Sequence, residues 1–153
     1  MRLLNMAAAI RPATAQDAAL LAPLCAEHAA YERIAGCGAG HAGRLAAALA
    51  QGRLRAWLAL SDGEPVGYAS ATVDFATLAG APFLHLDCLY LRESVRGLGL
   101  GRALLAAVAE HGRAQGYAEL QWQTPAWNRS AIGFYRRLGG QMRAKARFSL
   151  ALV

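Results

Sequence analysis

The spacing of hydrophobic residues divides the chain into helix-like and strand-like segments. Apolar residues at helical spacing predict helices over residues 15–30, 41–51, 100–114 and 129–138. Apolar or alternating runs predict strands over residues 6–11, 54–60, 66–74, 83–91 and 118–123, with one or two more in residues 141–152. No repeat or linker interrupts this order, so we predict one mixed α/β layered domain over residues 1–153.

Polar residues and glycines mark the boundaries of these elements. Thr14 and Asp17 form a variant of the capping box, and Asn128 is a good N-cap for the last helix. The pair Asp62-Gly63 predicts a tight hairpin turn between two strands.

The run over residues 83–91 is the most distinctive strand. It is apolar at nearly every position, which is typical of a central strand covered on both faces. It contains a single acid, Asp87. We expect residues 75–82, which precede it, to be a loop.

A glycine-rich turn follows this strand and leads into a helix. Gly97, Gly99 and Gly101 alternate along it, and Arg96 and Arg102 stand on either side. A strand, a bare backbone and a helix N-terminus together form a cradle for an anion. The spacing matches neither the dinucleotide fingerprint nor the P-loop. The turn therefore binds phosphate in another way, or it is a glycine-rich turn without a ligand.

The composition of the chain limits its possible binding partners. The net charge of +6 comes almost wholly from arginine and indicates an anionic partner, namely nucleic acid or a phosphorylated cofactor, or else a bias of composition. The arginines are scattered, so we predict no nucleic-acid partner. No apolar run approaches the ~20 residues that span a bilayer, so we predict no membrane partner. Residues 1–8 are expected to be a disordered leader or to follow an early start codon.

The three cysteines form no C-x-x-C pair, which indicates a reducing compartment and predicts a cytoplasmic protein. The spacing of Cys25 and His28, followed by Cys37 and His41, is similar to a zinc-ligand set. The first two residues lie in a helical stripe and the others in a glycine-rich loop. We therefore predict packing or surface roles and no metal.

Three motifs carry a resemblance to a known family: Arg96-x-x-Gly99-x-Gly101, Ile10-Arg11-Pro12-Ala13-Thr14-x-x-Asp17, and Asn128-x-x-Ala131-Ile132-x-Phe134-Tyr135-x-x-Leu138-Gly139. With them the chain resembles the GNAT superfamily of acetyl-coenzyme A-dependent N-acetyltransferases over about residues 9–150. The resemblance implies an α/β (α+β) fold. Its central mixed, twisted sheet would have six to seven strands, with helices on both faces.

Within this superfamily the chain is most similar to the diamine (spermidine/spermine-type) acetyltransferases. The stretches that carry this are Ala30-Tyr31-Glu32, Leu86-Asp87-Cys88-Leu89-Tyr90-Leu91 and Ala126-Trp127-Asn128. The group usually has glutamate where this chain has Asp87, and it can carry an acid where this chain has Ala126.

The resemblance also implies which residues bind acetyl-coenzyme A. The turn would hold the pyrophosphate, and a bulged, splayed part of the central strand would pair with the pantetheine arm. Arg96 and Arg102 either pair with phosphate oxygens or are simply solvated. The cofactor-binding residues implied are Leu89, Tyr90, Leu91, Arg96, Gly97, Leu98, Gly99, Leu100, Gly101, Arg102, Asn128 and Tyr135.

Catalytic roles follow from the same resemblance. An amine with a pKa of ~10.4 costs about 4–5 kcal/mol to deprotonate at pH 7, so a base is expected. Asp87 would be that base, directly or through water, or else a buried and paired structural carboxylate. Tyr135 would donate a proton to the departing thiolate, or else be a core tyrosine. Tyr31 and Glu32, with Asp87, would bind a cationic acceptor, or else cap the first helix. Cys88 has no partner that would make it an acyl carrier.

The predicted function is transfer of an acetyl group from acetyl-coenzyme A to a primary amine of a small molecule. The acceptor would be polyamine-like or amino-acid-like, and it would attack directly in a ternary complex. The alternatives are acetylation of a protein N-terminus or an antibiotic amine, and a non-catalytic coenzyme A-binding module. The apolar final segment and the family habit predict a homodimer.

Overall fold

The computed structural model describes residues 7–153 and divides into two compact units, residues up to Gln123 and residues 124–153. Each unit is described by itself. Residues 1–6 of the predicted leader lie outside the described residues, and Ala8, its last residue, opens the first strand.

The first unit is built on one sheet whose strands lie in chain order. The first four strands are antiparallel, and the fifth runs parallel to the fourth. The strands are β1 (Ala8–Pro12), β2 (Arg55–Ser61), β3 (Glu64–Ala76), β4 (Ala81–Leu91) and β5 (Leu120–Trp122). The helices are η1 (Ala15–Asp17), α1 (Ala18–Tyr31), α2 (His41–Ala50), η2 (Glu93–Val95) and α3 (Leu100–Ala114).

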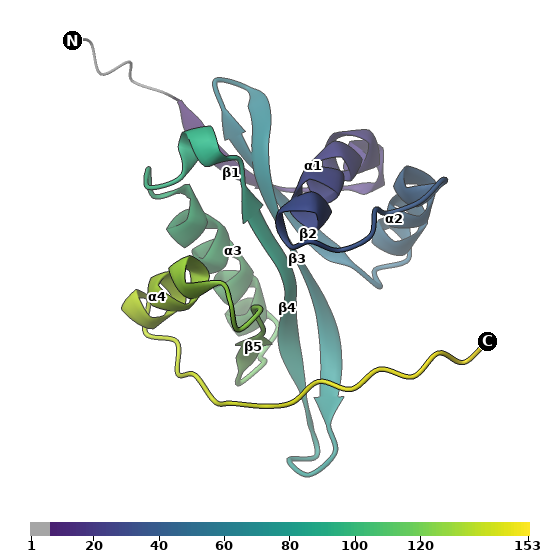
Figure 1. Cartoon of the computed structure of the whole chain (residues 1–153), viewed down its shortest axis with the longest axis vertical. Coiled ribbons are helices and arrows are strands. Elements are labelled where there is room, and N and C mark those ends of the chain that lie inside the picture. Colours follow the sequence, from purple (N-terminus) through teal and green to yellow (C-terminus); the bar gives the residue numbers. More distant parts are fainter. Residues whose placement is uncertain (1–6) are drawn as a thin grey trace. The chain divides into compact units, whose positions relative to one another are not determined.

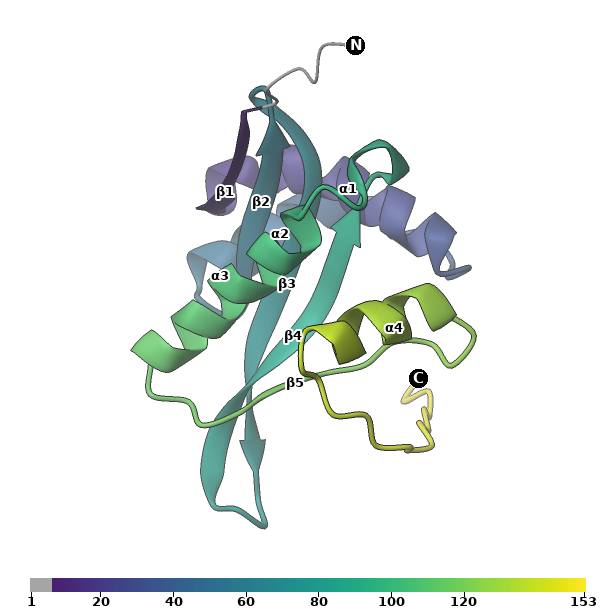
Figure 2. The ribbon, with the colours of Figure 1, turned by 90° about the vertical axis from the view of Figure 1, so that its left-hand side faces the viewer.

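Helices cover both faces of this sheet, as the resemblance implied. Figure 1 and Figure 2 show α3 on one face and the pair α1 and α2 on the other. On the α3 face, Leu84, Leu104 and Val108 are fully buried in the larger hydrophobic cluster. On the α1 face, Leu24 and Leu58 belong to a second, smaller cluster. The α/β class is therefore confirmed.

A β-bulge interrupts β4 at its middle. Ser70 and Ala71 of β3 pair with Cys88 and Leu86, so Asp87 is an extra residue without a register partner. Even-numbered apolar residues up to Leu86 pack towards α3, whereas even-numbered residues from Cys88 onward pack towards α1. The bulge thus reverses the alternation of the strand, and from Cys88 to Leu91 apolar side chains pack on both faces of the sheet, as the apolar run predicted.

The parallel pairing of β4 also ends at this point. β5 pairs with Leu84, His85 and Leu86 only, so within the described residues the rest of β4 has no partner on that side. The resemblance implied a bulge and a splay at Leu89–Leu91. The structure has both features, with the bulge at Asp87 and thus slightly earlier in the strand.

Some predicted boundaries are wrong. The loop expected over residues 75–82 is only a turn between Ala76 and Ala81, because β3 and β4 continue beyond β2 as a two-stranded ribbon. The Asp62-Gly63 turn is confirmed, with positive φ at both residues. The strand expected over residues 118–123 is shortened to β5, since only its middle meets a neighbouring strand.

The second unit contains one helix, α4 (Arg129–Arg137). Asn128 caps it as predicted, because its side-chain oxygen accepts a hydrogen bond from the Ala131 N–H at 3.1 Å. The strands predicted in residues 141–152 are absent, so the described residues contain five strands and not six or seven. A strand needs a hydrogen-bonding neighbour, which an apolar pattern alone does not supply. None of the helices in the described residues is long and apolar enough to cross a membrane.

Candidate functional site

The glycine turn at the start of α3 has the geometry of an anion cradle. Gly97 and Gly99 adopt positive φ values of 77° and 86°, a region that side chains disfavour by about 1–2 kcal/mol. A Cβ added at either glycine would meet no atom of the described residues within 4 Å. The backbone is therefore bare and open, and the N-terminus of a 15-residue helix adds partial positive charge there.

The Arg96 side chain leaves this turn and reaches back to the sheet. Its Nε donates a hydrogen bond to the Leu91 carbonyl at 2.9 Å. Its guanidinium carbon lies 4.9 Å from the centre of the Tyr31 ring and 5.8 Å from that of Tyr90. Arg96 thus ties the end of β4 to the end of α1. Arg102 is exposed in the first turn of α3.

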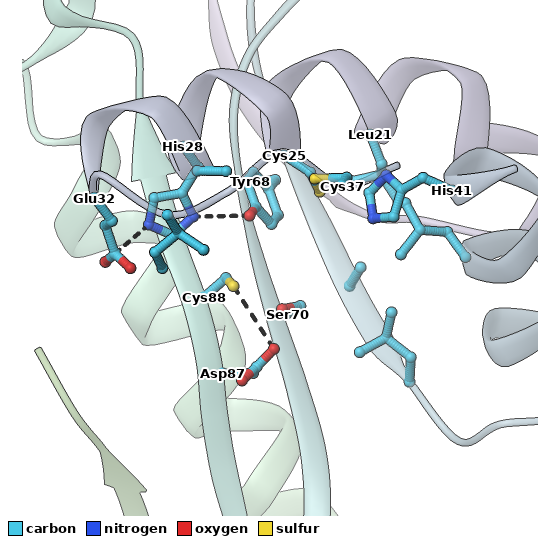
Figure 3. Close-up of a pocket in the computed structure, with 15 residues that line it drawn as sticks. Leu21, Cys25, His28, Glu32, Cys37, His41, Tyr68, Ser70, Asp87 and Cys88 are labelled. Carbon is cyan, nitrogen blue, oxygen red and sulfur yellow. Dashed lines mark hydrogen bonds and ion pairs between the residues drawn. The ribbon is translucent and has the colours of Figure 1, made fainter. Parts of the chain in front are cut away.

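A cavity of about 220 Å³ lies on the α1 and α2 face of the sheet. Its lining is mainly apolar, and its polar side chains come from α1 and its C-cap, from α2, and from β3 and β4 (Figure 3). Two of the predicted acceptor-binding residues, Glu32 and Asp87, line it. Tyr31 does not line it and lies instead beside Arg96 and Tyr90.

Asp87 stands at the bulge, where β4 loses its β5 partner. Its carboxylate is exposed, lines the cavity and accepts a hydrogen bond from the Cys88 thiol at 3.6 Å. The structural alternative, a buried carboxylate, is therefore wrong in its burial. The bulge presents Asp87 at the mouth of the cavity, where an acceptor amine could reach it.

Glu32 occupies the end of the first helix and also lines the cavity. It is the C-cap residue of α1, and its carboxylate lies 3.1 Å from Nε2 of His28. Its side chain is 25% exposed, whereas that of His28 is 9% exposed. The acidic group is thus at the cavity edge and already has one polar neighbour.

Sequence reasoning missed two further polar residues of the cavity, His28 and Tyr68. His28 lies in the helical stripe predicted for residues 15–30, and Tyr68 lies in the strand predicted for residues 66–74, and neither position by itself indicates a site. Both are buried, and His28 Nδ1 lies 2.8 Å from the Tyr68 hydroxyl. The available signal was the spacing of His28 and Glu32, which are four residues apart on one helix face.

The environment keeps two thiols of the cavity, those of Cys25 and Cys88, protonated. Burial, followed by the nearby charge of Asp87, raises the pKa of Cys88 to about 12. Burial also raises the pKa of Cys25. A thiol in this state is a poor nucleophile, which agrees with the expectation that Cys88 carries no acyl group. Within the described residues no three His, Cys, Asp or Glu side chains gather as a metal site would require.

The remaining predicted site residues lie in three places. Leu89, Tyr90 and Leu91 form the end of β4, and Leu98 and Leu100 flank Gly99 in the turn. Asn128 and Tyr135 belong to the second unit, where Asn128 caps α4 and Tyr135 lies 5.2 Å from the Phe134 ring.

The family profile that matches this sequence describes acetyltransferases, and its matching relatives include acetyltransferases. The profile of the Acetyltransferase (GNAT) family matches residues 24–140. A thialysine N-epsilon-acetyltransferase of Caenorhabditis elegans is 36% identical over 72 residues, which cover 47% of this chain and 44% of that protein. An L-methionine sulfoximine/L-methionine sulfone acetyltransferase of Pseudomonas aeruginosa is 39% identical over 84 residues, or 52% of this chain and 48% of that protein. The match thus spans less than half the length of each of these relatives.

Solved structures share the whole fold. The crystal structure of an aminoglycoside acetyltransferase from an uncultured soil metagenomic sample superposes with a TM-score of 0.84. The alignment covers 95% of this chain and 97% of that one, at 18% sequence identity. At this identity the likeness is one of fold alone.

Proposed function

We propose, because the chain belongs to the GNAT acetyltransferase family, that it transfers an acetyl group from acetyl-coenzyme A to a primary amine of a small molecule. One observation carries the proposal. The bulge at Asp87 coincides with the end of the β5 pairing and with the mouth of the cavity on the α1 face. A carboxylate thus stands where two strands part, beside a cavity that can take an amine.

The cradle before α3 fits the pyrophosphate of coenzyme A. Backbone N–H groups of the turn over residues 96–102 would bind it, since Gly97 and Gly99 leave their surface bare. The backbone of Leu89, Tyr90 and Leu91 would pair with the pantetheine arm, because β5 does not reach them. When bound, the coenzyme supplies the activated acetyl thioester.

The cavity favours a small cationic acceptor. At about 220 Å³ it suits an aliphatic amine chain, and its acidic side chains are Glu32 and Asp87. The named substrates of the relatives, thialysine and methionine sulfoximine, are amino-acid-like. We therefore favour a polyamine-like or amino-acid-like amine over a protein N-terminus or an antibiotic. Tyr31 would act from outside the cavity by holding Arg96 and Tyr90 in place.

The proposed chemistry is direct attack in a ternary complex. Asp87, directly or through a water molecule, accepts a proton from the acceptor nitrogen. Tyr135 of the second unit is assigned, from the family motif, as the acid that protonates the departing thiolate. Asn128 is assigned to the pantetheine amide in addition to its capping role.

Two measurements test this function. Calorimetry should show acetyl-coenzyme A binding, and mass spectrometry should then detect acetylated product from a panel of lysine, ornithine, thialysine, spermidine, an N-terminal peptide and an aminoglycoside. Binding without any product would indicate the non-catalytic module, and no binding at high micromolar concentration would refute the proposal. Product from the peptide or the aminoglycoside alone would refute the acceptor class.

A pair of glycine variants tests the cradle. Gly99→Ala should weaken coenzyme A binding about tenfold or more, since the added methyl enters the cradle and strains its backbone. Gly116→Ala is the matched control, because Gly116 has a similar φ of 80° and open surroundings beyond the other end of α3. Equal affinities of the two variants would place the pyrophosphate elsewhere.

The proposed assembly is a cytoplasmic homodimer. Apolar side chains that would suit a subunit contact are exposed near the C-terminus, such as Phe148, Leu150 and Leu152. The three cysteines are free thiols, as a reducing compartment would keep them. Light scattering at micromolar concentration distinguishes a dimer from a monomer.

A further inference from the structure

A chain of hydrogen bonds crosses the inner wall of the acceptor cavity and has no role in the chemistry described so far. His28 is its centre, with Nδ1 at 2.8 Å from the Tyr68 hydroxyl and Nε2 at 3.1 Å from a Glu32 carboxylate oxygen. All three side chains line the cavity, and they point toward one another in Figure 3. The His28 ring is stacked on that of Tyr90, with ring centres 5.2 Å apart.

The chemistry of the partners fixes where the protons lie. An ionised Glu32 carboxylate can only accept, so Nε2 of His28 carries the hydrogen. In the neutral imidazole Nδ1 is then an acceptor, and the Tyr68 O–H donates to it. Burial raises the pKa of Tyr68 above its ordinary value, which keeps this hydroxyl protonated. The Tyr68 oxygen retains lone pairs that can accept a proton from the cavity.

The proposed reaction removes two protons from the acceptor nitrogen. One leaves when the ammonium becomes an amine, and the other leaves when the amide bond forms. The departing thiolate consumes one proton, so one must reach solvent. Asp87 is the only exposed carboxylate assigned to this task, and it can hold one proton at a time.

We propose that Tyr68 and His28 take the first of these protons, the one on the ammonium, and leave Asp87 to take the second. This proposal rests on the acetyltransferase function proposed above. Tyr68 contacts the acceptor in this scheme, and His28 acts through Tyr68.

The transfer balances without a further reactant. The N–H bond of the ammonium breaks, its electron pair stays on nitrogen, and the proton forms an O–H bond at Tyr68. The original Tyr68 proton moves in the same event to Nδ1 of His28, so Tyr68 remains neutral. His28 becomes an imidazolium paired with Glu32. One proton then leaves to bulk water at Glu32, whose side chain is 25% exposed.

Charged and titratable groups from the neighbouring elements surround His28. Glu32 supplies the carboxylate that contacts the ring, and the Arg96 guanidinium carbon lies 5.8 Å from the centre of the stacked Tyr90 ring. The other titratable side chains that line the cavity are Tyr68, Cys25, Cys37, His41, Cys88 and, at the cavity mouth, Asp87. The raised pKa values of Cys25 and Cys88 keep these two thiols neutral, so the direct negative partner of an imidazolium would be Glu32.

The test compares two acceptors of different basicity. An alkylamine such as lysine is almost wholly an ammonium at pH 7, whereas trifluoroethylamine is mostly neutral, because fluorine withdraws electrons. His28→Gln cannot carry a proton but keeps an amide donor and acceptor. We expect His28→Gln to lower kcat/KM for lysine at pH 7 by about 100-fold, the scale of general-base catalysis, and for trifluoroethylamine by less than about threefold. The lysine defect should also shrink as the pH rises towards 10.

Controls separate a proton route from a structural role. His111→Gln, on the α3 face of the sheet, should leave both acceptors unaffected. Tyr68→Phe breaks the chain at its other link and should reproduce the selective loss, which keeps the test valid if His28→Gln does not fold. Asp87→Asn should lower kcat/KM for both acceptors.

The possible outcomes are distinguishable. A selective loss with lysine that is rescued by high pH supports the route. An equal loss with both acceptors, at all pH values, overturns it and indicates that His28 only shapes the cavity. If the wild-type protein acetylates neither amine while binding acetyl-coenzyme A, the proposed function fails in its acceptor class, and the proton route falls with it.

Discussion

Gly67→Ala tests whether the close pairing of β3 with the end of β4 sets the geometry of the site. Gly67 pairs with Leu91, and a Cβ built on it would lie 2.5 Å from both the Tyr90 carbonyl oxygen and the Leu91 Cδ2. Real Cβ atoms do not approach other atoms closer than 3.0 Å, so the strands must separate locally. The carbonyl belongs to the backbone and cannot turn away as a flexible side chain can.

The expected cost is that of overpacking a tight core site, about 1–3 kcal/mol in the free energy of unfolding. We place Gly67→Ala at the upper end, because one of the two clashes is with backbone. The shift displaces Tyr90 and Leu91, so affinity for acetyl-coenzyme A should fall together with stability. Urea denaturation measures the first effect and calorimetry the second.

Gly43→Ala is the matched control. Gly43 lies within α2, and no atom lies within 4 Å of its added Cβ. The same methyl should therefore stabilise the protein by about 0.5–1 kcal/mol, through helix propensity alone. A loss below about 0.5 kcal/mol for Gly67→Ala would refute the reasoning, since overpacking should exceed this value.

Three further changes have defined outcomes. The Arg11 guanidinium, by hydrogen bonding, lowers the pKa of Asp17 from 3.8 to about 2. The ionised Asp17 therefore stabilises the folded protein above about pH 4, and this stabilisation is lost as the pH falls through about 2. Asp17→Asn should lower the free energy of unfolding by about 1–2 kcal/mol at pH 7, a range discounted because Arg11 is partly exposed. This difference should disappear well below the folded-state pKa, as urea titrations across pH will check. Cys88 should resist iodoacetamide at pH 8 in peptide mapping, because its pKa of about 12 leaves little thiolate, and rapid labelling would contradict this. Asn128→Ala should speed amide exchange in α4 by an amount equivalent to about 1 kcal/mol, whereas Asn128→Asp should keep the cap.

Local signals in the sequence predicted the elements well. Helical spacing located α1, α2 and α3 to within a few residues, and the Asp62-Gly63 pair fixed a hairpin turn that the structure confirms. These features depend on residues close together in the chain. The α3 N-terminus was predicted for the same reason, since Gly97 and Gly99 are needed for the positive φ of the turn itself.

The errors concern interactions between distant residues. Residues 141–152 have a strand-like composition, but strand structure depends on a neighbour that composition does not specify. His28 and Tyr68 are 40 residues apart, so their hydrogen bond arises only when α1 packs on β3. Asp87 was recognised as a candidate base, but its exposure follows from the bulge, which a single apolar run does not reveal.

Asp87 contributes both the extra residue that forms the bulge and a carboxylate. A deletion and a substitution together test these two contributions separately. Because Asp87 is an extra residue, its deletion would restore regular alternation and leave Leu86 and Leu89 facing α3 and Cys88 facing α1, as they do now. The deletion should therefore leave the core intact while removing the bulge, whereas Asp87→Ala keeps the bulge and removes the carboxylate. If strand geometry positions the thioester, the deletion should weaken acetyl-coenzyme A binding and Asp87→Ala should not. Equal binding by both variants, measured by calorimetry with unfolding transitions that remain cooperative, would show that the bulge serves only to present the carboxylate.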